Sequence, residues 1–129
     1  MQYLADTVAL IRHRSKVGKI GKAAKRILEE ADHGRHQIFI SVISLVEILY
    51  LSEKQRIALD LDDALDTINY SQNYSIVDLT PEIVKVASAS ACKELHDRLI
   101  LSTAKYLGVP ILTSDHEMEK LNEVPTIWQ

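Results

Sequence analysis

The chain has 129 residues, of which 47% are hydrophobic and 26% are charged. This composition is typical of one soluble globular domain with a single core. The formal net charge of -3 at pH 7 excludes a globally basic nucleic-acid-binding protein, so a nucleic acid would have to be bound by a local patch or through a metal ion. Cys92 is the only cysteine, which excludes an intramolecular disulfide and a Cys–Cys metal site.

Strands and helices are predicted to alternate along the chain. A short apolar run ends on Asp6, and a later helix with apolar residues on one face is broken by Gly34. Thr80 followed by Pro81 marks the start of a helix, and Gly108 marks the end of another. The predicted strands cover residues 3–6, 37–41, 74–79, 109–114 and 126–128, and the predicted helices cover residues 22–31, 44–55, 59–70, 80–91, 96–108 and 117–122.

Strands separated by helices favour an α/β fold with a parallel sheet covered by helices. Right-handed crossovers place the carboxyl ends of the strands and the starts of the following helices at one edge of the sheet. Ligands of open α/β sheets bind at that edge. The sequence contains no linker, repeat or low-complexity segment, so residues 1–129 are predicted to form one domain.

No targeting or membrane segment is predicted. The N-terminal stretch MQYLADTVALIRHRSK has its charges after a short apolar run, the reverse of a secretory signal. No apolar segment approaches the roughly 20 residues that span a bilayer. Together with the single cysteine, this predicts a cytoplasmic protein without a membrane partner.

Four carboxylates occupy the predicted functional edge of the sheet. Asp6 and Asp115 follow predicted strands, Glu47 lies in the first turn of a predicted helix, and Asp97 opens another helix. Two like charges about 4 Å apart repel by about 4 kcal/mol at an effective dielectric constant of 20, so a cluster of four requires protonation, separation or a cation. Oxygen ligands favour Mg²⁺ or Mn²⁺. Spacing alone does not bring Asp97 to the cluster, because its helix does not follow a strand directly.

Each acid also has an ordinary structural interpretation. Ser44 and Glu47 match a capping box, in which the glutamate closes the helix start onto its own backbone. Asp97 and Asp115 match helix caps or first-turn acids, which favour the helix dipole. Asp6 matches a turn residue. The sequence pattern by itself leaves both interpretations open.

Three segments carry a resemblance to a known family: YLADTVALI (3–11), ISVISLVEI (40–48) and HDRLILSTAKYLGVPILTSD (96–115). They resemble, in order, the acidic motifs of PIN-domain ribonucleases, and specifically those of the VapC-type toxins of toxin–antitoxin pairs. The resemblance spans nearly the whole chain, and its last segment is the most specific. It implies a three-layer α/β/α sandwich with a central, mainly parallel sheet.

The resemblance also implies an activity and its residues. In this family four acids meet at the carboxyl edge of the sheet and bind one or two divalent cations, Mg²⁺ or Mn²⁺. Carried over to this sequence, the catalytic and metal-binding acids are Asp6, Glu47, Asp97 and Asp115. The implied reaction is hydrolysis of RNA phosphodiester bonds, in which the metal activates a water molecule and neutralises charge on the phosphate.

Hydroxyl residues flank two of these acids. Thr7 follows Asp6 as the family's hydroxyl does and is expected to orient a carboxylate or a metal-bound water, although an ordinary turn or cap hydroxyl explains it equally well. Thr113 and Ser114 are expected to support Asp115 in a similar way. One branch of the family begins with DTHALL, whereas Val8 replaces the histidine here, so no role of that histidine carries over.

A basic segment follows the first acidic motif. It contains 7 of the 15 Lys and Arg residues of the chain: Arg12, Arg14, Lys16, Lys19, Lys22, Lys25 and Arg26. We expect Arg12, Arg14 and Lys16 to contact RNA phosphates, which attract local cations even on an acidic protein. The alternative is a solvated helix face balanced by the acids that follow. Aromatic residues make up only 5% of the chain, so base stacking is expected to contribute little to recognition.

The resemblance further implies two protein partners: a second copy of the chain and a small antitoxin whose C-terminal part lies over the active site. The apolar segment ILYLSE (48–53) and the helix after it match a dimer face or an antitoxin groove. An amphipathic helix packed in its own core explains the same residues.

Two other functions compete with the nuclease. One is a PIN-like domain that binds RNA or protein without cutting, against which the complete set of four acids argues. The other is a haloacid-dehalogenase-like phosphatase, which also begins with an aspartate after the first strand. That family needs a second aspartate two residues later, where this chain has Val8.

Overall fold

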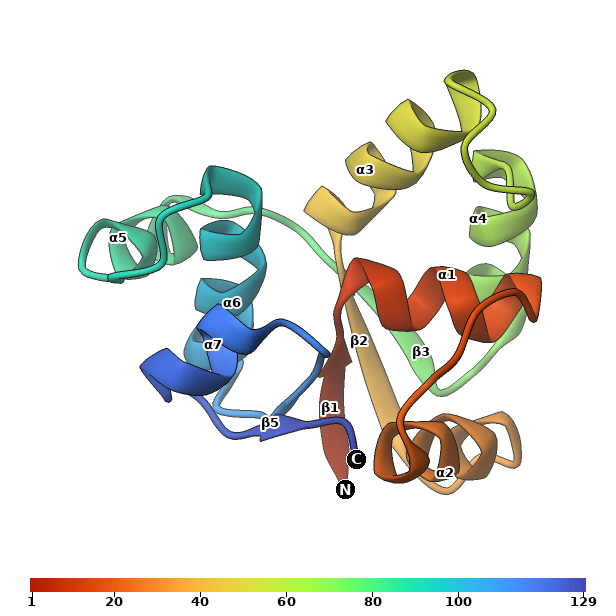
Figure 1. Ribbon diagram of the computed structural model, residues 1–129, viewed down its shortest axis with the longest axis horizontal. Helices are drawn as coiled ribbons and strands as arrows, with labels where there is room; N and C mark the ends of the chain where they lie inside the picture. Colours follow the sequence, from red (N-terminus) through yellow and green to blue (C-terminus); the bar gives the residue numbers. More distant parts are fainter.

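The computed structural model describes residues 1–129 (Figure 1). The strands are β1 (Gln2–Ala5), β2 (Gln37–Ser41), β3 (Tyr74–Val77), β4 (Ile111–Leu112) and β5 (Thr126–Ile127). The helices are α1 (Thr7–Ser15), α2 (Lys22–Asp32), α3 (Val42–Glu53), α4 (Leu61–Tyr70), α5 (Pro81–Ser88), α6 (Leu95–Leu107) and α7 (His116–Leu121).

The five strands form one sheet in the order β3-β2-β1-β4-β5, and every pair is parallel. The chain moves outward from β1 through β2 to β3, and then returns to the other side of β1 as β4. The strand order therefore reverses between β1 and β4, and such a switch point is where open α/β sheets bind ligands. Asp6 follows β1 directly, and Asp115 comes shortly after β4.

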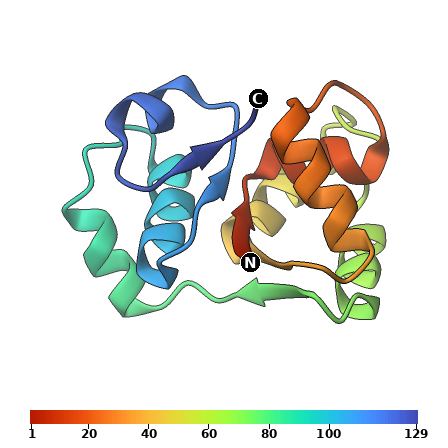
Figure 2. The ribbon, with the colours of Figure 1, turned by 90° about the horizontal axis from the view of Figure 1, so that it is seen from below.

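Helices cover both faces of the sheet, as Figure 2 shows: α1–α4 lie on one side and α5–α7 on the other. Side chains of β1 alternate between the two resulting cores. Tyr3 and Ala5 belong to the cluster with α1, α2, α3 and α4, whereas Leu4 belongs to the cluster with α6 and α7. Ile111 and Leu112 divide in the same way. This alternation, which follows from the two-residue period of a strand, establishes the predicted three-layer α/β/α sandwich.

Every predicted strand and helix is present, and one helix was not predicted. Helix α1 contains Arg12 and Arg14 of the basic segment, and its buried residues include Ala9, Leu10, Ile11 and His13. Consecutive buried positions point in different directions around a helix, so α1 shows no apolar stripe at helical spacing. The basic segment is therefore divided between α1, the loop 16–21 and α2.

Two helix starts also differ from the predictions. Helix α3 begins at Val42, and its N-cap is Ser41, whose hydroxyl accepts from the backbone N–H of Ile43 at 3.1 Å. Glu47 therefore lies in the second turn, and the capping box of Ser44 and Glu47 is wrong. Helix α6 begins one residue before His96, so Asp97 lies in its first turn behind a different cap residue. No helix is both long and apolar enough to cross a membrane.

Candidate active site

Four acids from four different elements line one pocket. Asp6 is the N-cap of α1, Asp115 is the N-cap of α7, Glu47 lies in α3, and Asp97 lies in the first turn of α6. In Figure 1, α1 and α3 leave the upper ends of β1 and β2 on one side of the sheet, and α6 lies on the other. The structure therefore brings together the four acids that the sequence singled out. Thr7 and Ser114 line the same pocket.

Asp6 is held from two directions. It is buried, with 8% of its surface exposed. Its Oδ1 accepts the backbone N–H of Thr7 at 2.8 Å, and its Oδ2 accepts the hydroxyl of Thr113 at 2.7 Å. The hydroxyl oxygen of Thr113 in turn accepts the backbone N–H of Asp115 at 3.0 Å. Thr113 therefore connects two of the four acids, while Ser114 beside it is exposed at the rim.

Glu47 is oriented by a pair of buried hydroxyls. The hydroxyl of Thr7 donates to Oε1 of Glu47 at 2.5 Å and lies 2.8 Å from the hydroxyl of Ser44. Because Thr7 has one proton and donates it to the carboxylate, Ser44 is the donor between the two hydroxyls. Ser44 is fully buried. The sequence suggested a cap for this serine, whereas the structure gives it a place behind Glu47.

Asp97 is positioned through the start of α6. Glu94 is the N-cap of this helix, and its Oε2 accepts the backbone N–H of Asp97 at 2.7 Å. Arg98 holds the preceding loop by donating to the carbonyls of Cys92 at 2.8 Å and Lys93 at 3.1 Å. Glu94 is a fifth acid near the pocket that the sequence analysis missed. No sequence signal marks it, because glutamate is not among the residues that N-caps prefer.

The thiol of Cys92 is not a nucleophile. Burial raises its pKa to about 12, and a hydrogen bond from the thiol to Oε1 of Glu117, at 3.3 Å, favours the protonated form further. Reactive cysteines have the opposite environment, with a lowered pKa and positive neighbours. The chemistry of the pocket therefore depends on its carboxylates.

The carboxylates repel one another. Burial raises the pKa of Asp6. The hydrogen bonds from Thr113 and Thr7 lower this pKa, whereas the charges of Glu47 and Asp115 raise it further. Burial also raises the pKa of Asp97 to about 7, with further contributions from Asp6, Glu94, Asp115 and Glu47. None of the four acids in the pocket forms an ion pair with a basic side chain. The protein itself supplies no positive charge to balance them.

The carboxylate oxygens of the pocket are suitable ligands for a hard divalent cation, although the side chains are not spaced as a set of metal ligands. Carboxylate oxygens without a cationic partner are the donors that Mg²⁺ and Mn²⁺ take. No group of three or more His, Cys, Asp or Glu side chains has the spacing of a metal-ligand set in this structure. A bound cation would draw the carboxylates closer together and offset the mutual repulsion that, after burial, raises the pKa of Asp97. The donor set therefore fits such an ion, and the four side chains would have to close around it.

The basic residues predicted to contact RNA lie outside this pocket. Arg14 is largely buried, with 17% of its side chain exposed; its guanidinium lies 4.7 Å from the centre of the Tyr74 ring and 3.5 Å from Oδ1 of Asp32. Arg12 donates from Nη1 to the carbonyl of Lys19 at 2.8 Å. Lys16 is exposed in the loop after α1. The guanidinium of Arg14 is thus engaged with Tyr74 and Asp32.

Comparison with known proteins shows the family of the chain. The sequence profile of the PIN domain matches residues 3–124. The chain belongs to the PIN-domain family. None of the curated proteins compared with it matches.

Solved structures extend the comparison of this PIN domain. VapBC2 from Rickettsia felis bound to a DNA fragment from its promoter superposes with a TM-score of 0.73 at 18% identity, over 100% of both chains. A toxin–antitoxin complex from Klebsiella pneumoniae superposes with a TM-score of 0.68 at 22% identity, over 97% of this chain and 95% of that chain. DNA-bound VapBC from Salmonella typhimurium superposes with a TM-score of 0.66 at 17% identity, over 98% of this chain and 97% of that chain. The fold is therefore shared along nearly the full length of these chains.

Proposed function

We propose that this PIN domain is an endoribonuclease that depends on Mg²⁺ or Mn²⁺ and serves as the toxin of a toxin–antitoxin pair. The observation that carries the proposal is the acidic pocket: four carboxylates from four elements, at the switch point of a parallel sheet, with no basic partner. A phosphodiester is itself anionic and cannot approach such a pocket until a cation neutralises it.

The proposed catalytic and metal-binding residues are Asp6, Glu47, Asp97 and Asp115. Bound between them, a divalent cation would lower the pKa of a water ligand and neutralise charge on the scissile phosphate. In the balanced reaction, the hydroxyl of water bonds to phosphorus, the bond between phosphorus and the leaving oxygen breaks, and the proton of water goes to that oxygen. The chain's own part is to hold the carboxylates in position and to exclude other nucleophiles.

Specific hydroxyls perform this positioning. Thr7 fixes Oε1 of Glu47 and leaves Oε2 without a protein donor. Thr113 fixes Asp6, while Asp115 uses only Oδ1 to cap Met118, at 3.0 Å. Oxygens of these acids thus stay available to a cation. Ser114, at the exposed rim of the same pocket, is placed to contact the substrate or a metal-bound water.

The similarity to VapBC complexes supports the partner part of the proposal. The fold is shared with chains that were solved with an antitoxin. Helix α3 exposes three large apolar side chains, Val46, Leu49 and Tyr50, with 48%, 41% and 52% of their surfaces accessible. This face suits a homodimer or the apolar part of an antitoxin, because contiguous exposed apolar residues mark interaction surfaces.

The test is a cleavage assay on total cellular RNA, with and without Mg²⁺ or Mn²⁺, in which new RNA ends are mapped by sequencing. Asp97→Asn tests the pocket, and Asp78→Asn, an exposed aspartate outside it, is the matched control. Discrete metal-dependent ends that Asp97→Asn abolishes and Asp78→Asn preserves are the expected result. Folded wild-type protein that yields no new ends contradicts the proposal and favours a PIN domain that binds without cutting.

A further inference from the structure

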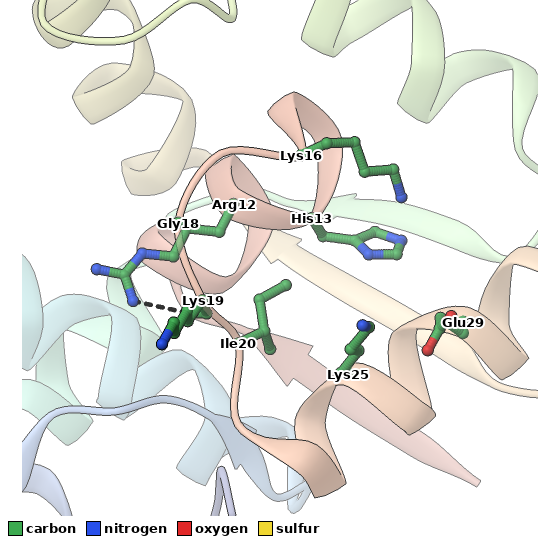
Figure 3. Close-up of a pocket in the computed structure, with 8 residues that line it drawn as sticks. All are labelled: Arg12, His13, Lys16, Gly18, Lys19, Ile20, Lys25 and Glu29. Carbon is green, nitrogen blue, oxygen red and sulfur yellow. Dashed lines mark hydrogen bonds between the residues drawn. The ribbon is translucent and has the colours of Figure 1, made fainter.

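A second pocket lies at the opposite end of α1 from the acids. It is formed by the last turns of α1, the loop 16–21 and one face of α2, and Figure 3 shows Ile20 between Lys19 and Lys25, with Lys16 on the side of His13. Arg12 lines the same pocket. We call this set of one arginine and three lysines the basic pocket.

The positive charge of the basic pocket is not balanced by the protein. Arg12, Lys16, Lys19 and Lys25 form no ion pair. Glu29 is the only acid that lines the pocket, and it forms no ion pair either. A chain with a net charge of -3 thus concentrates unpaired cations at one place, which is the electrostatic footprint of an anion-binding site.

The loop that carries two of the lysines is held in place. Arg12 donates from Nη1 to the carbonyl of Lys19 at 2.8 Å, so the loop folds over its side chain. Gly18 has φ +88°, and a Cβ there would lie 3.0 Å from Cδ and Nε of Arg12. The left-handed backbone favours glycine, and a larger residue would also have to push the Arg12 side chain aside. The loop is therefore built against Arg12, and the ammonium groups of Lys16 and Lys19 lie at its surface.

His13, which also lines the basic pocket, is fixed in position. His13 is 3% exposed, and its Nε2 lies 2.8 Å from Oδ2 of Asp32. Burial lowers the pKa of His13 against the opposing effect of Asp32. In Figure 3 the side chain of Lys16 lies on the same side of the pocket as this ring.

Helix α1 connects the two pockets. Thr7, its first residue, lines the acidic pocket, and Lys16 follows its last residue. At 1.5 Å per residue the two positions lie about 14 Å apart along the helix axis, a distance that a single RNA strand spans in a few nucleotides. The acidic pocket repels the phosphates on either side of the scissile bond, so an RNA strand needs cations beside the acids to stay bound.

We propose that the basic pocket binds backbone phosphates of the RNA strand a few nucleotides from the bond that the acidic pocket cuts. The position of the cut rests on the proposed function, whereas the binding itself does not. The contacts are to phosphate and not to bases, so they hold the strand without reading its sequence. The three lysines are the residues to test, because Arg12 also holds the loop through its hydrogen bond to the carbonyl of Lys19.

The test is fluorescence anisotropy with a labelled single-stranded RNA oligonucleotide, in EDTA and in the Asp97→Asn background to prevent cutting. One variant replaces Lys16, Lys19 and Lys25 with alanine. Its control replaces Lys85, Lys105 and Lys120, three exposed lysines elsewhere, and makes the same change in net charge. Circular dichroism checks that both variants fold.

We expect the variant of the basic pocket to weaken RNA binding at least about tenfold and to lower the slope of log K against log salt by about 1 to 2, since each lost phosphate contact removes about 0.7 for a single strand. The control should keep both values near those of the parent. Equal losses in the two variants, or no loss in the first, overturn the inference.

Inorganic phosphate, titrated at constant ionic strength, separates an RNA strand from a free anion. If RNA stays bound in millimolar phosphate, the result supports binding of an RNA strand. If micromolar phosphate displaces the RNA, the proposal is wrong and the basic pocket is a site for small anions. The nuclease activity and the RNA binding of the basic pocket are tested separately. A protein that cuts no RNA disproves the nuclease, and the anisotropy measurement still decides the basic pocket.

Discussion

Oδ2 of Asp6 accepts a hydrogen bond of 2.7 Å from the hydroxyl of Thr113, although the two residues are 107 positions apart in sequence. The same hydroxyl oxygen accepts the backbone N–H of Asp115. Because β1 and β4 are neighbouring parallel strands, one threonine at the end of β4 fixes both the acid that follows β1 and the acid that follows β4. A single buried hydroxyl thus links two of the four acids of the acidic pocket.

Thr113→Val removes this hydroxyl and keeps the shape of the side chain. We expect metal affinity and RNA cleavage to fall by about 10- to 100-fold, the usual cost of losing a group that orients a metal ligand. Calorimetric titration with Mn²⁺ and the cleavage assay measure the two effects. Without its partner, Asp6 also loses a hydrogen bond that lowers its pKa, so its pKa should rise further.

Thr103→Val is the matched control for this prediction. Thr103 is 1% exposed, and its hydroxyl donates to the carbonyl of Leu99 at 2.8 Å within α6, away from the acids. This variant should leave metal affinity unchanged. If both variants lose metal affinity equally, the effect comes from general destabilisation, and the positioning role of Thr113 is wrong.

Much of this site could be predicted from the sequence because two acids follow strands. The carboxyl ends of parallel strands meet at one edge, so Asp6 and Asp115 could be placed there before the structure was known. Asp97 could not, because α6 follows α5 and not a strand; only its resemblance to a family motif indicated a place beside the others. The packing of α6 on the sheet, through Ile100, Leu101 and Ala104, brings Asp97 to the pocket.

The supporting hydroxyls were harder to predict. Ser44 and Glu47 have the spacing of a capping box, and local spacing carries no information about a partner 37 residues away, such as Thr7 for Ser44. Helix α1 escaped prediction for a related reason, since residues buried on several of its sides leave no periodic pattern. The role of Ser44 and the formation of α1 both depend on tertiary contacts, which a local sequence pattern does not record.

The pKa of Asp97 predicts how the metal-free protein responds to pH. In an unfolded chain an aspartate has a pKa of about 3.9, and in the folded protein burial raises that of Asp97 to about 7. The folded state therefore binds the proton more tightly, and this contribution to stability is complete below about pH 4 and is lost as the pH rises through about 7. We expect the melting temperature of metal-free protein to fall between about pH 5 and about pH 8.

Asp97→Asn identifies the part of this change that belongs to Asp97. The variant should show a smaller fall in melting temperature than the wild type, and Asp78→Asn should behave as the wild type does. Adding Mg²⁺ should raise the melting temperature of the wild type more at the higher pH, because the ligand must be ionised. Parallel pH curves for the wild type and Asp97→Asn contradict the prediction.

Arg14 is predicted to support stability and not RNA binding. Its guanidinium stacks on Tyr74 and pairs with Asp32, and both Nε and Nη2 are buried. Arg14→Met should lower the free energy of unfolding by about 1–3 kcal/mol, because it removes a buried cation–π contact and leaves Asp32 less well paired. Urea unfolding measures this loss, and anisotropy should show RNA affinity within about twofold of the wild type.

Arg26→Met is the matched control for Arg14. Its side chain is 79% exposed, and its only ion pair, with Glu30, is 3.8 Å long. Such a surface pair contributes little, so the free energy of unfolding should change by less than about 0.5 kcal/mol. A large loss of RNA affinity in Arg14→Met at unchanged stability would restore Arg14 to the RNA-binding residues.

Arg98 is predicted to act on the site through the loop before α6. Its two hydrogen bonds to the carbonyls of Cys92 and Lys93 fix the chain that leads to Glu94 and Asp97. Arg98→Met should raise amide exchange in residues 90–97 and lower cleavage about 10-fold, because a misplaced ligand weakens metal binding.

The expected signature of Arg98→Met is a loss of activity that excess metal partly restores, since the carboxylates themselves are intact. Arg56→Met, at an exposed arginine in the turn after α3, should change neither exchange nor cleavage. An Arg98→Met protein that exchanges faster throughout the chain, and not only before α6, has lost global stability. Unchanged exchange in residues 90–97 would instead mean that the loop is held by its other contacts, the hydrogen bonds from Ser90 and Ala91 to Glu123, and not by Arg98.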